Sequence, residues 1–421
     1  MWLYFTPFLG KPPVLNERQW LVIGLMSLVV FISTYDLGLF SLALKQIQAS
    51  LDMPEEELGR IGALVRLGSL PAFFFTLIAD RIGRKRIMVF STLMVTILTG
   101  ASAFSMGISS FIVLQFLIHI FGAAAVLLAF VVLAEELDPE VRGWGIGALT
   151  ALGACGGGLA LVLFAFIDVL PFGWRALYLA GLLPILWIAS FNEHIPESRR
   201  FEAFQEGREK APFMEDSLRP IISLVRMYPG RFLALGSVIF LLNFSLNASG
   251  FFTPKYLQEA HGWAPWHYAV LGYFGGFIGI FGSAYAGRLS DRHGRRKVAS
   301  FFLGVHPFLV LAFFQFSGFL LPPLWITMVF SGIAGSVVLG AFGQELFPTS
   351  YRSTSSGALM ILGTAGGVLG FWAESLIYNL IGSHWTAISL LAVLSLAAPI
   401  IVAFFFPETS KRTLEAISPE I

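Results

Sequence analysis

The chain is 421 residues long, and 56% of its residues are hydrophobic while only 13% are charged. A soluble globular domain carries about 25% charged residues, and disordered chains are poor in apolar residues, so the composition excludes both classes. The net charge is +1, and no basic block interleaved with aromatic residues indicates a nucleic-acid surface.

Twelve apolar runs follow one another along the chain. Each is long enough for a membrane helix, which needs about 20 mostly apolar residues. Backbone groups in lipid must be paired within the protein, so these runs are predicted to be helices. The runs cover residues 20–46, 59–79, 87–107, 110–134, 144–167, 176–195, 232–254, 267–289, 298–318, 323–344, 354–381 and 385–406. The sequence therefore predicts an all-α membrane protein with twelve transmembrane helices.

Basic residues gather on one side of these predicted helices. The sequence holds 27 lysines and arginines, and most of them lie in loops that share a side with the N-terminus. Cytoplasmic loops carry the excess of basic residues in membrane proteins. We therefore expect both termini in the cytoplasm. The short loops favour a multi-pass protein of a bacterial inner (plasma) membrane.

Short motifs recur in the second half of the chain at nearly one offset. The sequence D-R-I-G-R-K at 80–85 recurs as D-R-H-G-R-R at 291–296. E-L-D-P at 136–139 recurs as E-L-F-P at 345–348, and P-E-S at 196–198 recurs as P-E-T at 407–409. Three matches at nearly one offset predict two six-helix halves that share one orientation.

The repeat divides the chain into three predicted parts. They are an N-terminal six-helix half at 1–195, a cytoplasmic connector at 196–231, and a C-terminal six-helix half with a cytoplasmic tail at 232–421. Parallel repeats of this kind imply a pseudo-two-fold axis along the membrane normal. We expect two pseudo-symmetric bundles around a central cavity that opens alternately to each side.

These features resemble the major facilitator superfamily over essentially the whole chain. The loop D-R-x-G-R-[RK] after the second helix of each half is similar to the signature loop of that superfamily. Its aspartate can accept bonds from basic groups and helix ends, and acidic residues at the inner helix ends fit the same cytoplasmic gate. The expected gate residues are Asp80, Arg81, Gly83, Arg84, Glu136, Arg142, Asp291, Arg292, Gly294, Arg295, Glu345 and Arg352.

Four further motifs are similar to the sugar-porter, aromatic-acid and organic-ion symporter branches. They are Y-D-L-G at 35–38, P-E-S-R-R at 196–200, Asn247 followed by F-F-T-P at 251–254, and P-E-T at 407–409. Sugar porters place paired glutamines before that asparagine, where this chain has Leu241 and Leu242. A hexose needs many hydrogen-bonding partners, so the substitution argues against a simple sugar.

Two ionisable residues lie deep in predicted spans, where charges are costly and usually functional. At 1.5 Å per residue, Asp36 is about 15 Å and Arg66 about 12 Å from the outer ends of their helices. The similar depths predict an ion pair or a shared aqueous cavity. We hypothesise that Asp36 takes up a coupling proton beside Arg66. The alternative is a permanent ion pair that only holds two helices together.

The other polar groups in the spans have open assignments. Glu374 is predicted to be a second proton site or the counter-charge of a cationic substrate, or else an interfacial carboxylate reached by water. In the superfamily a helix-1 aspartate often works with a helix-4 arginine, and Gln115 stands at the corresponding place, with His119 one turn deeper. Both residues are expected to line the substrate cavity. His119 is as well explained by packing.

Asn243 and Asn247 are spaced i, i+4 and share a helix face. They are expected either to line the substrate cavity or to join helices. Phe251 is expected to line the same cavity.

The predicted function is a secondary active transporter, a proton-coupled symporter of a small organic solute. Arg66 and the abundant phenylalanines favour an anionic or aromatic metabolite. The alternative is a uniporter or a drug/proton antiporter that exports lipophilic or cationic compounds, and the least favoured is a non-transporting membrane sensor. We expect a monomer in the lipid bilayer that uses the proton gradient, with no enzymatic activity, cofactor, metal or nucleic-acid partner.

Overall fold

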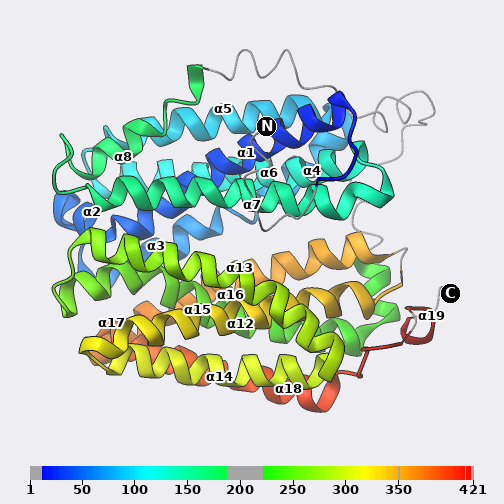
Figure 1. Cartoon of the computed structure of the whole chain (residues 1–421). Helices are drawn as coiled ribbons and strands as arrows, with labels where there is room; N and C mark the ends of the chain where they lie inside the picture. The colour runs from blue at the N-terminus through cyan, green and yellow to red at the C-terminus, as the bar shows by residue number, and fades with distance from the viewer. Residues whose placement is uncertain (1–11, 187–220, 349–350, 413, 419–421) are drawn as a thin grey trace. The chain divides into compact units, whose positions relative to one another are not determined.

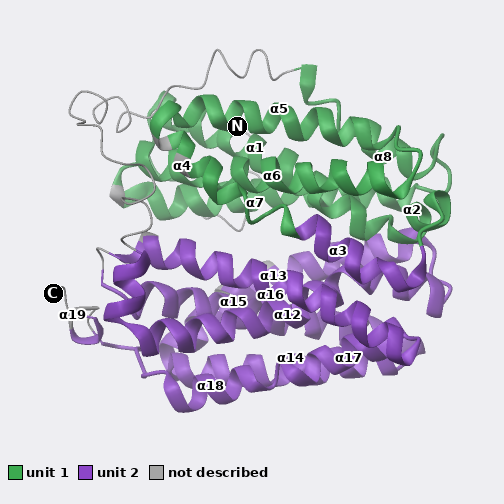
Figure 2. Cartoon of the chain, turned by 180° about the vertical axis from the view of Figure 1, so that it is seen from behind, with its two compact units in different colours: residues 1–53, 67–210 green, residues 54–66, 211–421 purple. Residues whose placement is uncertain are grey.

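The computed structural model describes residues 12–186, 221–348, 351–412 and 414–418, and all regular elements in these ranges are helices. The chain forms two compact units (Figure 2). Unit 1 comprises residues 1–53 and 67–210, and unit 2 comprises residues 54–66 and 211–421. The predicted connector at 196–231 lies largely outside the described residues, so the predicted three-part division stays a prediction.

Figure 1 shows the helices of unit 1, two of which begin at a capping residue or a proline. Its helices are α1 (Glu17–Leu42), α2 (Leu44–Leu51), α4 (Ala72–Ile82), α5 (Arg84–Ser102), α6 (Ile108–Glu136), α7 (Pro139–Ala165) and α8 (Trp174–Ala180). Asn16 caps α1 by accepting from the backbone N–H of Gln19 at 2.8 Å, while Gln19 accepts from Asn16 in return. Pro139 opens α7, where its missing N–H costs nothing.

The core of unit 1 lies between α1, α6 and α7. Apolar side chains of α1, among them Val22, Met26 and Val29, are fully buried there. Gly156 of α7 packs directly against the carbonyl of Phe31, where a Cβ would overlap the oxygen. Because α7 packs this closely on α1, it fixes the rotation of α1 about its axis and therefore the direction in which Asp36 points.

Unit 2 contains the remaining described helices. They are η2 (Glu55–Glu57), α3 (Leu58–Leu67), α12 (Pro229–Ala260), α13 (Pro265–His293), α14 (Arg295–Gln315), η3 (Gly318–Leu320), α15 (Leu321–Glu345), α16 (Arg352–Ile381), α17 (His384–Leu394), α18 (Ala397–Phe405) and α19 (Leu414–Ile417). Gly366 and Gly370 of α16 lie on the carbonyls of Phe240 and Phe244 of α12. Small residues allow this approach of two membrane helices.

Within the described residues, ten helical segments are long and apolar enough to cross a membrane, judged by length and composition. Helix α5 covers residues 87–102 of the predicted span 87–107 but is not among these ten segments. The predicted span 176–195 begins with α8 but ends outside the described residues. The helix predicted over 59–79 is broken between α3 and α4. Pro71 explains the break, because it has no N–H to donate to the carbonyl of Leu67.

Candidate functional site

Asp36 is buried on α1, with 2% of its surface exposed. Its Oδ1 lies 2.5 Å from Oγ1 of Thr99 on α5, and Oγ1 lies 2.7 Å from the carbonyl oxygen of Val95. A threonine hydroxyl carries a single hydrogen. An ionised Asp36 accepts from Thr99 and shares this hydrogen with Val95, whereas a protonated Asp36 donates to Thr99 and leaves the hydrogen for Val95. The arrangement therefore suits a carboxyl group that binds a proton.

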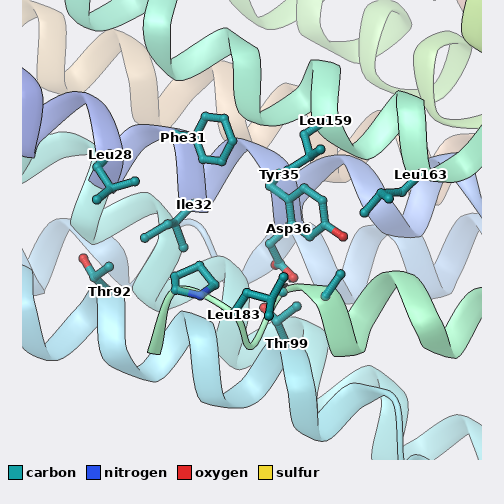
Figure 3. Close-up of a pocket in the computed structure, with 13 residues that line it drawn as sticks. Leu28, Phe31, Ile32, Tyr35, Asp36, Thr92, Thr99, Leu159, Leu163 and Leu183 are labelled. Carbon is teal, nitrogen blue, oxygen red and sulfur yellow. Dashed lines mark hydrogen bonds between the residues drawn. The ribbon is translucent and has the colours of Figure 1, made fainter. Parts of the chain in front are cut away.

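The Asp36 carboxyl borders a cavity of about 830 Å³ in unit 1, shown in Figure 3. Tyr35 lies beside it on α1, and its hydroxyl donates to the carbonyl of Leu177 at 2.6 Å. The rest of the lining is mostly apolar and comes from α1, α5, α7 and the end of α8: Leu28, Phe31, Ile32, Thr92, Thr99, Leu159, Leu163, Ala180, Gly181, Leu183 and Pro184. The other carboxyl oxygen, Oδ2, has no hydrogen-bond partner in the described part of the chain.

Gln115 and His119 of α6 make local contacts in unit 1. Gln115 is 1% exposed, and its Nε2 donates to Oγ of Ser102 on α5 at 3.2 Å. Nδ1 of His119 lies 3.0 Å from the carbonyl oxygen of Gln115. Gln115 thus joins α5 to α6, and the predicted cavity role of both residues stays a prediction.

Arg66 lies on α3 in unit 2, so the predicted pair with Asp36 of unit 1 stays a prediction. Its Nε is buried and has no hydrogen-bond partner among the described residues. The guanidinium lies over Gly367 of α16, beside the amide of Asn247 on α12. A Cβ on Gly367 would stand 2.5 Å from Arg66 Nε and 2.9 Å from Asn247 Nδ2. We call Arg66 and Asn247 the donor pair.

Asn243 and Asn247 lie on one face of α12, as their i, i+4 spacing predicts. Nδ2 of Asn247 donates to the carbonyl of Asn243 at 2.8 Å and lies 3.2 Å from Oδ1 of Asn243. One turn further, the ring of Phe251 packs edge-to-face on Phe371 of α16, with ring centroids 5.1 Å apart. Two amides and a pair of aromatic rings therefore lie along the contact of α12 with α16.

Glu374 of α16 is completely buried and belongs to a larger network in unit 2. Its Oε1 lies 2.5 Å from Nδ1 of His384, and Nε2 of His384 lies 3.1 Å from Glu55 Oε2. Lys255, also completely buried, donates from Nζ to Glu55 Oε1 at 2.9 Å and to Glu259 Oε1 at 2.6 Å. We call these five residues the acid–base network.

Sequence reasoning identified only Glu374 in this network. Neither Lys255 nor Glu55 nor His384 is singled out by the sequence analysis. The i, i+4 spacing of Lys255 and Glu259 is a readable signal. The contacts of Glu55 are not readable, because they join residues 200 and 329 positions apart.

Two predicted gate residues of unit 1, Arg84 and Glu136, each take part in an ion pair at the end of α6. Arg84 pairs with Glu135, and Nε of Arg18 lies 2.9 Å from Glu136 Oε2. Arg142 instead donates to the carbonyl of Leu137 at 3.3 Å. Gly83, between α4 and α5, has a φ of 117°, which an L side chain rarely adopts. Arg81 is exposed, and the side chain of Asp80 lies outside what the structure describes.

Unit 2 repeats this arrangement at its own loop. Arg295 lies 2.7 Å from Glu345 and 3.1 Å from Asp291, and Gly294 has a φ of 102°. Arg295 is thus the repeat of Arg84, while Glu345 is the repeat of Glu136, the neighbour of the Glu135 that Arg84 contacts. Arg292 is exposed, and Nε of Arg352 is buried without a hydrogen-bond partner in the described ranges.

The sequence profile of the Major Facilitator Superfamily matches residues 26–371 and 277–419. The match covers most of the chain, so the protein belongs to this superfamily. It is an all-α, multi-pass membrane protein and a transporter of a small molecule, not an enzyme.

Individual relatives are similar over nearly the full length of the chain. The candidate niacin/nicotinamide transporter NiaP of Bacillus subtilis (strain 168) is 27% identical, with 86% of this chain and 89% of the relative covered. The 4-hydroxybenzoate transporter PcaK of Acinetobacter baylyi (strain ATCC 33305 / BD413 / ADP1) is 25% identical, with 93% and 91% covered. The inward open structure of the xylose transporter XylE from E. coli matches with a TM-score of 0.74 at 16% identity, over 95% of this chain and 99% of that one. The structural match shows the fold alone.

Proposed function

We propose that this protein imports a small aromatic or unsaturated carboxylate together with a proton, by alternating access across the inner membrane. The observation that carries the proposal is the donor pair. An arginine whose Nε is buried, and which has no acidic partner in the described part of the chain, lies beside an amide in a membrane span. A charge in this position is costly, and such residues mark substrate pathways.

Arg66 has the chemistry that a carboxylate requires. Its planar guanidinium binds both oxygens of a carboxylate through parallel hydrogen bonds, and it stays charged at any physiological pH. Asn247, whose Nδ2 also donates to Asn243, lies next to it, and Gly367 has no Cβ, so both side chains approach α16 closely. A bound carboxylate offsets the charge of Arg66 and completes its hydrogen bonds.

The aromatic part of the substrate fits the next turn of the same helices. Phe251 follows Asn247 by four residues and Phe371 follows Gly367 by four, so both rings lie one turn beyond the donor pair. Aromatic rings prefer edge-to-face or offset contacts with one another. Relatives named as transporters of niacin and of 4-hydroxybenzoate support an aromatic acid.

Asp36 supplies the proton site of the proposed symport. A protonated Asp36 donates to Thr99, so the single hydrogen of Thr99 is left for the carbonyl of Val95. An unpaired carboxylate facing an apolar cavity is costly, and a bound proton removes that cost. We infer that both termini are cytoplasmic and that the transporter is a monomer, as the sequence predicts.

One observation favours the alternative of lipophilic-cation export. The cavity beside Asp36 is lined almost wholly by apolar side chains, and Oδ2 lacks a hydrogen-bond partner in the described residues. An apolar cation would fit such a cavity and would neutralise the carboxylate. An antiporter of this kind would move a proton in the opposite direction to its substrate, so the two functions predict opposite pH changes.

The test uses purified protein in liposomes that enclose a pH-sensitive dye. Nicotinate added outside should acidify the lumen, whereas nicotinamide, with the same ring and no carboxylate, should not. Protein-free liposomes correct for passive entry of the undissociated acid. Alkalinisation on adding a lipophilic cation, without a response to nicotinate or 4-hydroxybenzoate, would replace the proposal by the antiporter.

Variants of Arg66 connect the activity to the donor pair. Arg66→Lys keeps the charge but loses the planar fork, so it should bind the carboxylate more weakly, and Arg66→Gln should abolish uptake. The matched control is Arg60→Gln, because Arg60 lies on the same helix, is exposed and pairs with Glu57 at 2.5 Å. Full activity of Arg66→Gln would contradict the assigned role.

A further inference from the structure

The contacts of His384 fix how many protons the acid–base network holds. Each ring nitrogen lies at hydrogen-bond distance from a carboxylate oxygen, 2.5 Å for Glu374 and 3.1 Å for Glu55. A bare nitrogen lone pair repels a carboxylate, so a hydrogen must lie in each contact. Whether the hydrogen between Nδ1 and Glu374 is bonded to the nitrogen or to the oxygen does not change the number of protons that the pair holds. The His384–Glu374 pair thus holds one proton more than a neutral imidazole beside a carboxylate.

The surroundings of the imidazole favour this extra proton. The rings of Phe252 and Tyr378 stack on His384, with centroids 4.7 and 4.1 Å away and interplanar angles of 24° and 21°. The face of an aromatic ring attracts a cation. His384 and Glu374 are both buried, so water cannot screen the repulsion that would follow loss of the proton.

The same residues attach segment 54–66 to the helices of unit 2. Glu55 binds Lys255 and His384, and the carbonyl of Glu56 accepts from Oγ of Ser375 at 2.8 Å. Gly59 lies directly against Glu374 Oε2, where a Cβ would overlap the oxygen. Because unit 1 continues at residues 53 and 67, this short segment is joined to unit 1 by the chain and to unit 2 by these contacts.

The charge balance of the network depends on one proton. Three carboxylates, those of Glu55, Glu259 and Glu374, face the ammonium of Lys255 and the imidazole of His384. With the proton these five groups carry a net charge of −1, and without it they carry −2. The remaining ionisable groups are Glu56 and Tyr378 nearby, and Glu57, which is paired with Arg60.

We propose that His384 and Glu374 form a second proton-binding site, and that its proton fastens segment 54–66 to α12, α16 and α17. Loss of the proton places a lone pair against a carboxylate, breaks the bridge from His384 to Glu55 and releases the segment. This proton-operated latch adds to the proposed symport, but its titration needs neither substrate nor a proton gradient.

The test is amide hydrogen exchange of the full-length protein in lipid nanodiscs. Exchange is measured on either side of the ordinary histidine range, at about pH 5.5 and about pH 8.5. The exchange rate of each amide in the wild type is divided by its rate in His384→Gln at the same pH. This ratio cancels the intrinsic pH dependence of exchange. In segment 54–66 the wild-type protein should exchange about tenfold more slowly than the variant at the lower pH. One hydrogen bond to a charged group is strong enough to slow exchange by this factor. The two proteins should exchange equally at the higher pH.

A matched pair of variants tests the latch without changing His384. Glu55→Gln should speed exchange of segment 54–66 at the lower pH about tenfold, since it removes a partner of His384 and Lys255. Glu56→Gln removes the same charge one residue away, from an exposed side chain, and should have no effect. Exchange in α14 and α15 reports whether each variant is folded.

Two results would overturn the proposal. One is a ratio of wild type to His384→Gln that does not change with pH in segment 54–66. The other is equal behaviour of Glu55→Gln and Glu56→Gln. Neither depends on transport, so a failure of the latch and a failure of the proposed symport are distinguishable.

Discussion

The space above Gly367 determines how Arg66 and Asn247 present their hydrogens. A methyl group at this position would come within 2.5 Å of one nitrogen and 2.9 Å of the other, so both side chains must move. We expect Gly367→Ala to raise the KM for the carboxylate by about tenfold, which corresponds to ~1.4 kcal/mol of binding free energy. Initial uptake rates over a range of substrate concentrations measure the change.

Gly357 provides the control for this substitution on the same helix. A Cβ at Gly357 would meet no atom within 4 Å, and alanine is the better helix former. Gly357→Ala should therefore leave the KM unchanged. If both variants lost affinity equally, the cause would be the helix itself and not the donor pair.

Asp36→Asn separates proton coupling from substrate binding. The amide has nearly the shape of the carboxyl and still donates to Thr99, but it cannot take up and release a proton at physiological pH. We expect substrate-driven acidification of liposomes to disappear, while exchange of labelled for unlabelled substrate continues at a similar rate. Acidification that persisted in Asp36→Asn would place the coupling proton elsewhere, with Glu374 the next group to replace.

Individual charges in apolar runs are the part of the candidate site that the sequence singles out. Asp36, Arg66 and Glu374 stand out because each is ionisable in a segment where charge is costly. Their partners could not be predicted, because Thr99 is one of many hydroxyls in the spans and His384 reaches Glu55 across 329 positions. The donor pair needed the structure for the same reason, since Arg66 and Gly367 meet only when α3 packs on α16.

At the scale of elements, the sequence predicted where helices exist better than where they break. The predicted run 385–406 is divided into α17 and α18, just as the run 59–79 is divided into α3 and α4. Pro399 lies in the first turn of α18 and has no N–H for the carbonyl of Ser395, which accepts from the N–H of Ala398 at 2.9 Å instead. Apolar composition continues across such a proline, so hydropathy alone does not detect the break.

The repeated loops predict equal ion pairs at equivalent places in the two units. The side chains of Arg295 and Glu345 are only 18% and 15% exposed, so water screens this pair less than a surface pair. A double-mutant cycle with Arg295→Gln and Glu345→Gln should give a coupling of about 1 kcal/mol in thermal unfolding, the upper end of what exposed pairs reach. The cycle for Arg84 and Glu135 should give a similar value.

The surface pair of Arg60 with Glu57 is the comparison for both cycles. Its side chains are 57% and 32% exposed, and an i, i+3 pair of this kind contributes about 0.3 kcal/mol. A coupling for Arg295–Glu345 no larger than that for Arg60–Glu57 would contradict a stabilising role for the loop pairs.

For the whole molecule, the repeat in the sequence and the match to the superfamily lead to the same fold. The repeated loop places an arginine beside an acid at the end of α6 and of α15, and its glycines have φ of 117° and 102°. Segment 54–66 is the exception, because by sequence it belongs to the N-terminal half and by contacts to unit 2. A repeat predicts what the halves share, whereas this attachment depends on residues that occur in one half only.

Charge balance of the complete cycle gives the last prediction. A monocarboxylate that enters with the single proton of Asp36 carries no net charge. A membrane potential acts on moved charge with about 2.3 kcal/mol per elementary charge per 100 mV, so it should not drive this uptake. We expect nicotinate uptake into liposomes to rise as the outside pH falls at constant inside pH, and to be unaffected by an inside-negative potassium diffusion potential.

The same measurement decides whether the His384–Glu374 proton crosses the membrane. A latch that binds and releases its proton on one side adds nothing to the charge moved, so uptake stays independent of potential in the wild type and in His384→Gln. If that proton were released inside, each cycle would carry one positive charge inward and the potential would accelerate uptake. Acceleration that disappears in His384→Gln would therefore turn the latch into a second coupling site, and acceleration in both proteins would point to a group other than this pair.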